Sequence, residues 1–296
     1  MSAALAAPDA GFSRWPAPAK INLFLHILGR RADGYHELQT CFQFLDVGDD
    51  IDLRVRADGR IERLAGLDIA PDTDLVVRAA KLLQSHARST QGVDIRVHKR
   101  IPAGAGLGGG SSDAATVLVA LNELWSLHLS VETLRELALS LGADVPVFVA
   151  GHCAWAEGVG ERLKFLVGAE CPIERIYLIV KPNCSVSTAE IFQAPELTRN
   201  SAPITIRGFL ETGGRNDCTE TVRGRFPPVA SALDWLSRFG EARMTGTGAC
   251  IYLALDSARR GEEILLRMPP EWTGFVARGL NESPLRAHLN ARGELV

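Results

Sequence analysis

The sequence predicts an α+β fold. Segments with strand-like alternation are concentrated in the first 100 residues, helical spacing follows in later segments, and the connections between them are mixed. A doubly wound sheet would instead show buried, continuously apolar strands alternating regularly with helices. The strand expected at 93–99 is not of that kind, because apolar and polar side chains alternate along it, as in a half-exposed strand.

In the first half of the chain, strands are expected where apolar and polar residues alternate and helices where apolar residues recur every three or four positions. Asp33-Gly34 marks a turn. Ser130 is expected to begin a helix that Gly142 closes. The expected strands are 15–28, 35–45, 50–56 and 93–99, and the expected helices are 74–84, a segment that runs to Trp125, and the segment after Ser130.

In the second half of the chain the expected helices and strands are shorter and more often interrupted. The change in composition near 160–172 is the candidate domain boundary, which predicts an N-terminal domain over 1–165 and a C-terminal domain over 166–296. A glycine-rich turn, Thr245-Gly-Thr-Gly248, precedes a strand. The elements expected here are strands over 175–181, 249–255 and 273–280 and helices over 187–192, 229–239 and 258–267.

Composition excludes several classes of protein. The chain has 296 residues, 46% of them hydrophobic and 23% charged, which is typical of a soluble globular protein. Its net charge of −3 argues against a nucleic-acid partner, and no apolar run is long enough for a membrane span. The six scattered cysteines indicate free, mostly buried thiols of a reducing cytoplasm, and the N-terminal segment lacks the pattern of a signal peptide. We therefore expect a cytoplasmic protein with no obligate protein partner.

The segment from Pro102 to Ser112 is the most informative part of the chain. It holds five glycines within the seven positions 104–110 and leads straight into a helix-forming run. Free backbone N–H groups and the helix dipole make such a helix start a phosphate site, whereas the alternative is a flexible linker. The segment lacks the Gly-Lys-Ser/Thr of a Walker A loop and the companion motifs of protein kinases. The segment matches the G-x-G-x-x-G fingerprint of dinucleotide-binding proteins. That fingerprint should follow a buried, continuously apolar strand, whereas the strand expected at 93–99 alternates.

Three further positions are candidates for chemistry. Lys20, one of only five lysines, shares a strand face with Asn22; it is either a cation for phosphoryl transfer or a solvated edge residue. Asp144 is either a base that accepts a hydroxyl proton or an ordinary turn aspartate. Pro146 is expected to hold the residue before it extended and so to orient this carboxylate. Tyr35 and His36 follow a turn. Their aromatic ring and imidazole are suited to stack on and hydrogen-bond a base or sugar, although packing in the core explains them equally well.

Four blocks together carry a resemblance to the GHMP kinase superfamily, and within it to the kinases that act on 4-diphosphocytidyl-2-C-methyl-D-erythritol. The blocks are Pro18–Phe24 continuing to Asp33–Leu38, Pro102–Ser112, Gly142–Pro146 and Met244–Ala249. The resemblance implies a two-domain α+β fold with the active site in the cleft between the domains. It also implies transfer of the ATP γ-phosphoryl group to the 2-hydroxyl of that small-molecule substrate, in isoprenoid biosynthesis by the non-mevalonate pathway.

The resemblance also implies roles for individual residues. Lys20 and Asp144 match the catalytic pair. ATP is expected with Mg²⁺, and the hydroxyls of Ser111 and Ser112 are alternative groups to face it, between which the sequence does not choose. Residues that match the substrate site are Asn22, Tyr35, His36, Thr188 and Phe192. Residues that match the ATP site are Lys99, Pro102, Ala103, Gly104, Ala105, Gly106, Leu107, Gly108, Gly109, Gly110, Ser111 and Ser112.

Two positions depart from the family pattern. Asp74 stands where the family more often has asparagine near the adenine. Ala105 replaces a glycine, which requires a φ below zero at this residue. The alternatives are another GHMP small-molecule kinase, a non-catalytic nucleotide sensor on the same scaffold, and a dinucleotide-dependent oxidoreductase.

Overall fold

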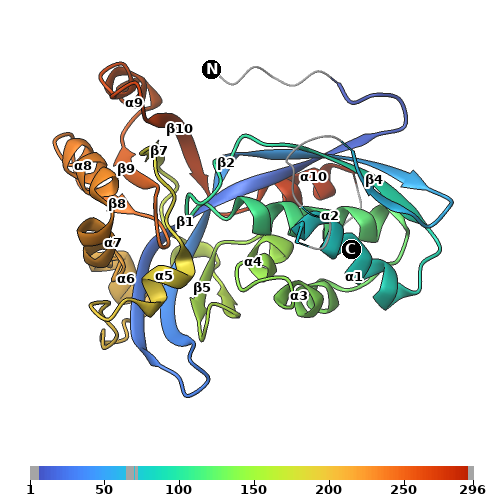
Figure 1. Ribbon diagram of the computed structural model, residues 1–296, viewed down its shortest axis with the longest axis horizontal. Coiled ribbons are helices and arrows are strands. Elements are labelled where there is room, and N and C mark those ends of the chain that lie inside the picture. Colours follow the sequence, from blue (N-terminus) through green and yellow to red (C-terminus); the bar gives the residue numbers. More distant parts are fainter. Residues whose placement is uncertain (1–6, 65–69, 71–72, 293–296) are drawn as a thin grey trace.

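The computed structural model describes residues 7–64, 70 and 73–292 and confirms the α+β class (Figure 1). Its central element is a long antiparallel hairpin of β1 (Ser13–Arg30) and β2 (His36–Arg56). The hairpin connects two groups of helices, one formed by α1 to α4 and α10 and the other by α5 to α9 (Figure 1). The described strands join in one sheet with the main order β3-β4-β2-β10-β7-β9-β8, and β1 and β5 also pair with β2.

The remaining strands are β3 Ile61–Arg63, β4 Gly92–His98, β5 Ala154–Glu157, β6 Arg162–Phe165, β7 Ile176–Lys181, β8 Ala242–Met244, β9 Ile251–Leu255 and β10 Thr273–Leu280. The helices are α1 Leu75–Ala87, α2 Gly109–Leu124, α3 Val131–Leu139, α4 Val145–Ala150, α5 Thr188–Gln193, α6 Ile206–Thr212, α7 Thr219–Arg225, α8 Pro227–Leu236, α9 Ala258–Leu265 and α10 Pro284–Arg292. None of the helices in the described ranges has the length and apolar character that crossing a membrane requires.

Three hydrophobic cores contact the hairpin, and the two largest lie toward its two ends. The first packs α1 to α4 against β1, β2 and β4, and the second packs α5, α7, α8 and α9 against β7 and β9. Each core also takes residues from the other half of the chain. Leu25 and Ile27 of β1 lie in the second core, whereas Leu285 and Leu289 of α10 lie in the first. The domain boundary between 165 and 166 stays a prediction.

Most expected elements are present, and β10 has the expected bounds. The expected strands 35–45 and 50–56 are wrong as separate elements, because both belong to the single strand β2. Gly48 lies between them, and a Cβ on it would stand 2.3 Å from the Ala17 carbonyl oxygen. This glycine therefore permits a close approach of β1 rather than a turn.

The polar face of β4 is half-exposed as expected at Arg96 and His98, but not at Asp94. Asp94 is fully buried, because Arg54 and Arg56 cover it with ion pairs of 2.6 and 2.7 Å. The helix that begins after Ser130 ends at Leu139, before the expected closing glycine. The elements that sequence analysis left out are β3, β5, β6, β8, α4, α6, α7 and α10.

Candidate functional site

A pocket of about 660 Å³ lies where the first hairpin, the glycine-rich segment and the second half of the chain meet. Its wall includes Lys20 of β1, Asp144 of α4's first turn, and residues 102–111. Thr188 and Phe192 of α5 line it from the other side. The structure thus brings the predicted catalytic pair and the predicted phosphate loop into one cavity.

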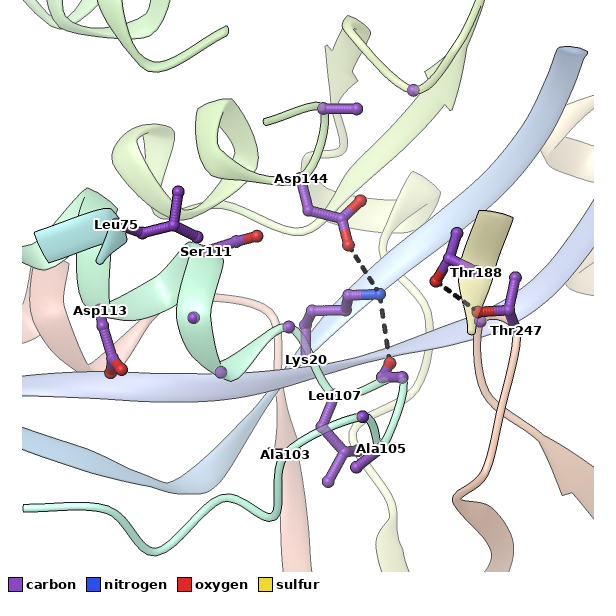
Figure 2. Close-up of a pocket in the computed structure, with 18 of the residues that line it drawn as sticks. Lys20, Leu75, Ala103, Ala105, Leu107, Ser111, Asp113, Asp144, Thr188 and Thr247 are labelled. Atoms are coloured by element: carbon purple, nitrogen blue, oxygen red, sulfur yellow. Dashed lines mark hydrogen bonds and ion pairs between the residues drawn. The ribbon is translucent and has the colours of Figure 1, made fainter. Parts of the chain in front are cut away.

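Lys20 holds its charge inside the protein. The residue is only 3% exposed, and its Nζ lies 3.1 Å from Asp144 Oδ2 (Figure 2). The ammonium also donates to Asn22 Oδ1 at 2.7 Å and to the Gly106 carbonyl oxygen at 3.3 Å. A buried ammonium is costly unless oxygen atoms surround it, and here three do. The interpretation of Lys20 as a solvated edge residue is therefore wrong.

Asp144 is the N-terminal cap residue of α4, and its side chain is 35% exposed on the pocket side. The expectation that Pro146 keeps Val145 extended is wrong, because both residues belong to the helix. Proline is tolerated in the first helical turn, where its missing N–H breaks no hydrogen bond. Asp144 instead has helical backbone angles at the start of this helix, and its carboxylate pairs with Lys20.

The glycine-rich segment curls around the Lys20 side chain and ends as a helix. α2 already begins at Gly109, so the last part of the predicted loop is the first turn of a helix with its N-terminus at the pocket. Gly108 has a φ of +74°, and a Cβ on it would stand 2.8 Å from the Phe148 ring. Ala105 is not among the residues with positive φ, so its methyl group is accommodated as the sequence required.

Backbone hydrogen bonds from the second half of the chain hold this loop in place. Ala249 N–H donates to the Gly104 carbonyl oxygen at 3.3 Å, and Cys250 N–H donates to that of Ala105 at 3.1 Å. Thr188 and Thr247 share a hydrogen bond of 2.9 Å at the pocket wall (Figure 2). The turn over 245–248, a weak signal in the sequence, is therefore part of the site.

The two serines of the loop differ in position. Ser111 lines the pocket, and Figure 2 shows its hydroxyl on the side that faces Asp144 and Lys20. Ser112 does not line the pocket; it is fully buried, and its Oγ has no hydrogen-bond partner among the residues that the structure describes. The helical geometry separates them, because neighbouring residues on a helix point in different directions.

The residues expected at the substrate end are only partly brought together. Asn22, Thr188 and Phe192 line the pocket, but Tyr35 and His36 do not. Tyr35 is 65% exposed in the turn between β1 and β2. His36 is buried against the Phe192 ring, with 5.1 Å between the ring centroids, and so borders the pocket from behind.

A buried cluster lies beside the first turn of α2. Lys99 Nζ donates to Asp49 Oδ2 at 2.5 Å and to Asp113 Oδ2 at 2.8 Å, and both Lys99 and Asp113 line the pocket. Burial raises the pKa of Asp113 to about 7; the Lys99 charge opposes this shift and the Asp49 charge adds to it. The sequence pattern did not indicate Asp113 as a site residue, although Asp113 lies in α2 directly after the glycine-rich segment.

The Asp74 carboxylate has two structural partners. Oδ1 accepts the Val76 N–H at 3.1 Å and so caps α1, and Oδ2 pairs with Arg63 Nη1 at 2.9 Å. Both Asp74 and Arg63 line the pocket near Leu75. Arg63 carried no signal in the sequence, because its partner lies in another element and only the fold brings them together.

The protein offers oxygen ligands for a magnesium ion but no closed metal cage. Among the described residues there is no group of three or more His, Cys, Asp or Glu side chains placed to hold a metal. The Asp144 carboxylate and the Ser111 hydroxyl both line the pocket. Mg²⁺ that accompanies a nucleotide needs only one or two protein oxygens besides phosphate and water. The Ser111 hydroxyl fits this role, whereas the Asp144 carboxylate is already paired with Lys20.

Comparisons with known proteins show which family the chain resembles. The family model described as GHMP kinases N terminal domain matches residues 74–152, and that described as GHMP kinases C terminal matches 202–272. The chain is 56% identical to the 4-diphosphocytidyl-2-C-methyl-D-erythritol kinase of Halorhodospira halophila, over 94% of this chain and 96% of that one. It is also 56% identical to the protein of that name from Nitrosococcus oceani, over 94% and 99%.

Solved structures of two kinases have a fold similar to that of this chain. A crystal structure of 4-(cytidine 5'-diphospho)-2C-methyl-D-erythritol kinase is 32% identical, with a TM-score of 0.77 over 90% of this chain and 99% of that one. The Methanococcus jannaschii mevalonate kinase, 17% identical, shares the fold with a TM-score of 0.68 over 93% and 100%.

Proposed function

Because the chain belongs to the 4-diphosphocytidyl-2-C-methyl-D-erythritol kinases of the GHMP kinase superfamily, we propose that it transfers the ATP γ-phosphoryl group to the 2-hydroxyl of that substrate. This reaction belongs to isoprenoid biosynthesis by the non-mevalonate pathway. The observation that carries the proposal is the 3.1 Å ion pair of Lys20 and Asp144 in the pocket where α2 begins.

Asp144 accepts the proton of the attacking hydroxyl. A general base must lie within hydrogen-bond reach of the proton it removes, and Asp144 is the carboxylate beside Lys20 on the pocket wall. Its partial exposure leaves room for an acceptor substrate next to the second carboxylate oxygen. Lys20 keeps this carboxylate in place and contributes positive charge where negative charge develops on the transferring group.

The glycine-rich loop holds the phosphates of ATP. Backbone N–H groups at the start of α2 point to the pocket, and the dipole of this 16-residue helix adds positive potential there. Lys99, already paired with two carboxylates, is the nearby cation at the nucleoside end of the loop. When bound, Mg²⁺ would neutralise charge on the phosphates, and Ser111 is the residue that would hold it.

Asn22, Thr188 and Phe192 are the substrate contacts on the opposite wall. Phe192 provides an aromatic face, and Thr188 and Asn22 provide hydrogen-bonding groups. Tyr35 and His36, at the end of the first hairpin, extend this side toward the cytidine end of the substrate. The 65% exposure of Tyr35 leaves its ring available for stacking on a base.

The test is an ADP-release assay with purified protein, ATP, Mg²⁺ and the cytidyl substrate, with mevalonate and homoserine as alternative acceptors. We expect turnover with the cytidyl substrate alone and a product phosphorylated at the 2-hydroxyl, as established by phosphorus NMR. Folded protein that binds ATP but turns over no acceptor would instead support a nucleotide sensor. Turnover of mevalonate or homoserine would show that the protein is a GHMP kinase for a different acceptor.

A further inference from the structure

Arg199 connects the two sides of the predicted cytidine end. Its Nε donates a hydrogen bond of 3.0 Å to His36 Nε2 on the first hairpin. Its Nη2 donates to the carbonyl oxygens of Phe192 and Ala194 at 3.1 and 2.6 Å, where α5 ends, and its Nη1 donates to that of Leu197 at 3.1 Å. One guanidinium thus binds His36 and the end of the helix that carries Phe192.

This contact determines where the His36 proton lies. An arginine side chain remains protonated and has only donors, so the ring nitrogen that faces Arg199 Nε must be an acceptor. His36 Nε2 therefore carries no hydrogen, and the neutral ring carries its proton on Nδ1. A protonated imidazolium would place two N–H groups against each other.

The surroundings of His36 favour the same state. The ring is 7% exposed and stacks on Phe192 with an interplanar angle of 30°. Burial lowers the pKa of His36, and the positive charges of Arg199 and Arg30 lower it further. Both charged groups that shift the pKa of His36 are therefore positive. Nδ1 has no hydrogen-bond partner among the described residues, which leaves its N–H available.

We propose that Arg199 is a positioning residue that holds His36 as the neutral Nδ1–H form, so that His36 donates a hydrogen bond to an acceptor atom on the pyrimidine base of the substrate. The inference rests on the proposed function for the identity of the base. Arg199 itself touches neither substrate nor ATP. It acts through His36 and through the end of α5, and so fixes the position of the His36 Nδ1–H donor relative to the Phe192 ring.

The first test uses the intact protein without substrate. Nitrogen-15 NMR of selectively labelled histidine, assigned with His36→Asn, reports which ring nitrogen carries the proton. We expect the neutral Nδ1–H form for His36 from pH 8 down to about pH 6, where an ordinary histidine is largely charged. A neutral Nε2–H form, or a charged ring at pH 6, would overturn the proposal without bearing on the kinase activity.

The second test uses Arg199→Met, which removes the guanidinium, and Arg207→Met as its matched control on α6, where the Arg207 side chain is 88% exposed. For Arg199→Met we expect a KM for the cytidyl substrate raised about tenfold, with kcat and the KM for ATP within about twofold of wild type. The loss grows below pH 7, because the His36 pKa moves back toward its ordinary value and the ring becomes charged. An unchanged KM, or an equal loss for both substrates, contradicts the positioning role.

A third comparison does not depend on folding of the Arg199 variant. Asn at position 36 keeps a donor near the place of Nδ1, whereas Gln places its amide near that of Nε2. We therefore expect His36→Asn to retain several-fold more kcat/KM for the cytidyl substrate than His36→Gln. The reverse order would contradict the proposal. If the wild-type protein turns over no cytidyl substrate at all, the proposed function fails, while the NMR result still decides the state of the ring.

Discussion

Gly106 packs so closely against Thr245 that a Cβ on Gly106 would stand 2.4 Å from the Thr245 carbonyl oxygen. Both partners are backbone, so no change of side-chain rotamer can relieve the contact. Gly106 also has a φ of +73°, which residues with a Cβ rarely adopt. The glycine at this position is thus required by the junction between the glycine-rich loop and the second half of the chain.

Gly106→Ala should destabilise the protein by about 2 kcal/mol or more, because the new methyl meets backbone and the φ is unfavourable. Gly110→Ala is the matched control, since its Cβ would meet only Leu75 at 3.5 Å and the residue lies within α2. Urea unfolding without ligands measures both. We expect the control to be unchanged or up to about 1 kcal/mol more stable. Equal destabilisation of the two variants would contradict this account of the loop.

Replacing either member of the Lys20–Asp144 pair should lower kcat by roughly 10²-fold or more, because each variant removes a base or a charge stabiliser. Asp144→Asn preserves the shape of the side chain, and Lys20→Ala is checked by thermal unfolding because the lysine is buried. Lys164→Ala, on the surface beside Glu170, is the control. A near-wild-type kcat for Asp144→Asn would remove Asp144 from the mechanism.

Asp113 should make stability depend on pH. Because its pKa is raised to about 7 in the folded protein, the folded state holds a proton that the unfolded state releases near pH 4. Its contribution to stability is therefore present below pH 4 and is lost as the pH rises through 7. Asp113→Asn does not titrate.

The stability of Asp113→Asn relative to wild type should consequently increase between pH 5 and pH 8, by on the order of 1–2 kcal/mol. Denaturant unfolding at the two pH values measures this difference. Asp256→Asn, at an exposed position, controls for general effects of charge. A difference that is constant with pH, or that has the opposite sign, would show that Asp113 is already ionised at pH 5.

Asp74 should separate a capping effect from a charge effect. Asp74→Asn retains an oxygen for the Val76 N–H but loses the charge that pairs with Arg63, whereas Asp74→Ala loses both. We expect Asp74→Ala to be less stable than Asp74→Asn by about 1 kcal/mol, the usual contribution of a helix cap. Thermal unfolding of the two variants and of wild type tests the order. Equal stability of Asn and Ala would show that the cap contributes nothing.

Local patterns predicted much of the fold. Alternation located β1 and β4, helical spacing located α1, α3 and α8, and the glycine-rich run located the start of α2. The errors have local causes as well. The two halves of β2 were separated by a glycine that serves a close strand contact. The small helix α4 was missed because a proline within its first turn resembles a helix end.

The sequence by itself determined the class of the protein, the position of the glycine-rich loop before α2 and the identities of the two central side chains, because glycine spacing and residue type are local properties. Only the tertiary structure decided that the Lys20 ammonium meets the Asp144 carboxylate, that Asn22 N–H binds Thr245 Oγ1 from 223 positions away, and that Arg199 faces His36. Such contacts depend on how the hairpin crosses both cores. Burial then determines how strongly each charge acts, and no local pattern encodes the desolvation of a side chain by distant segments.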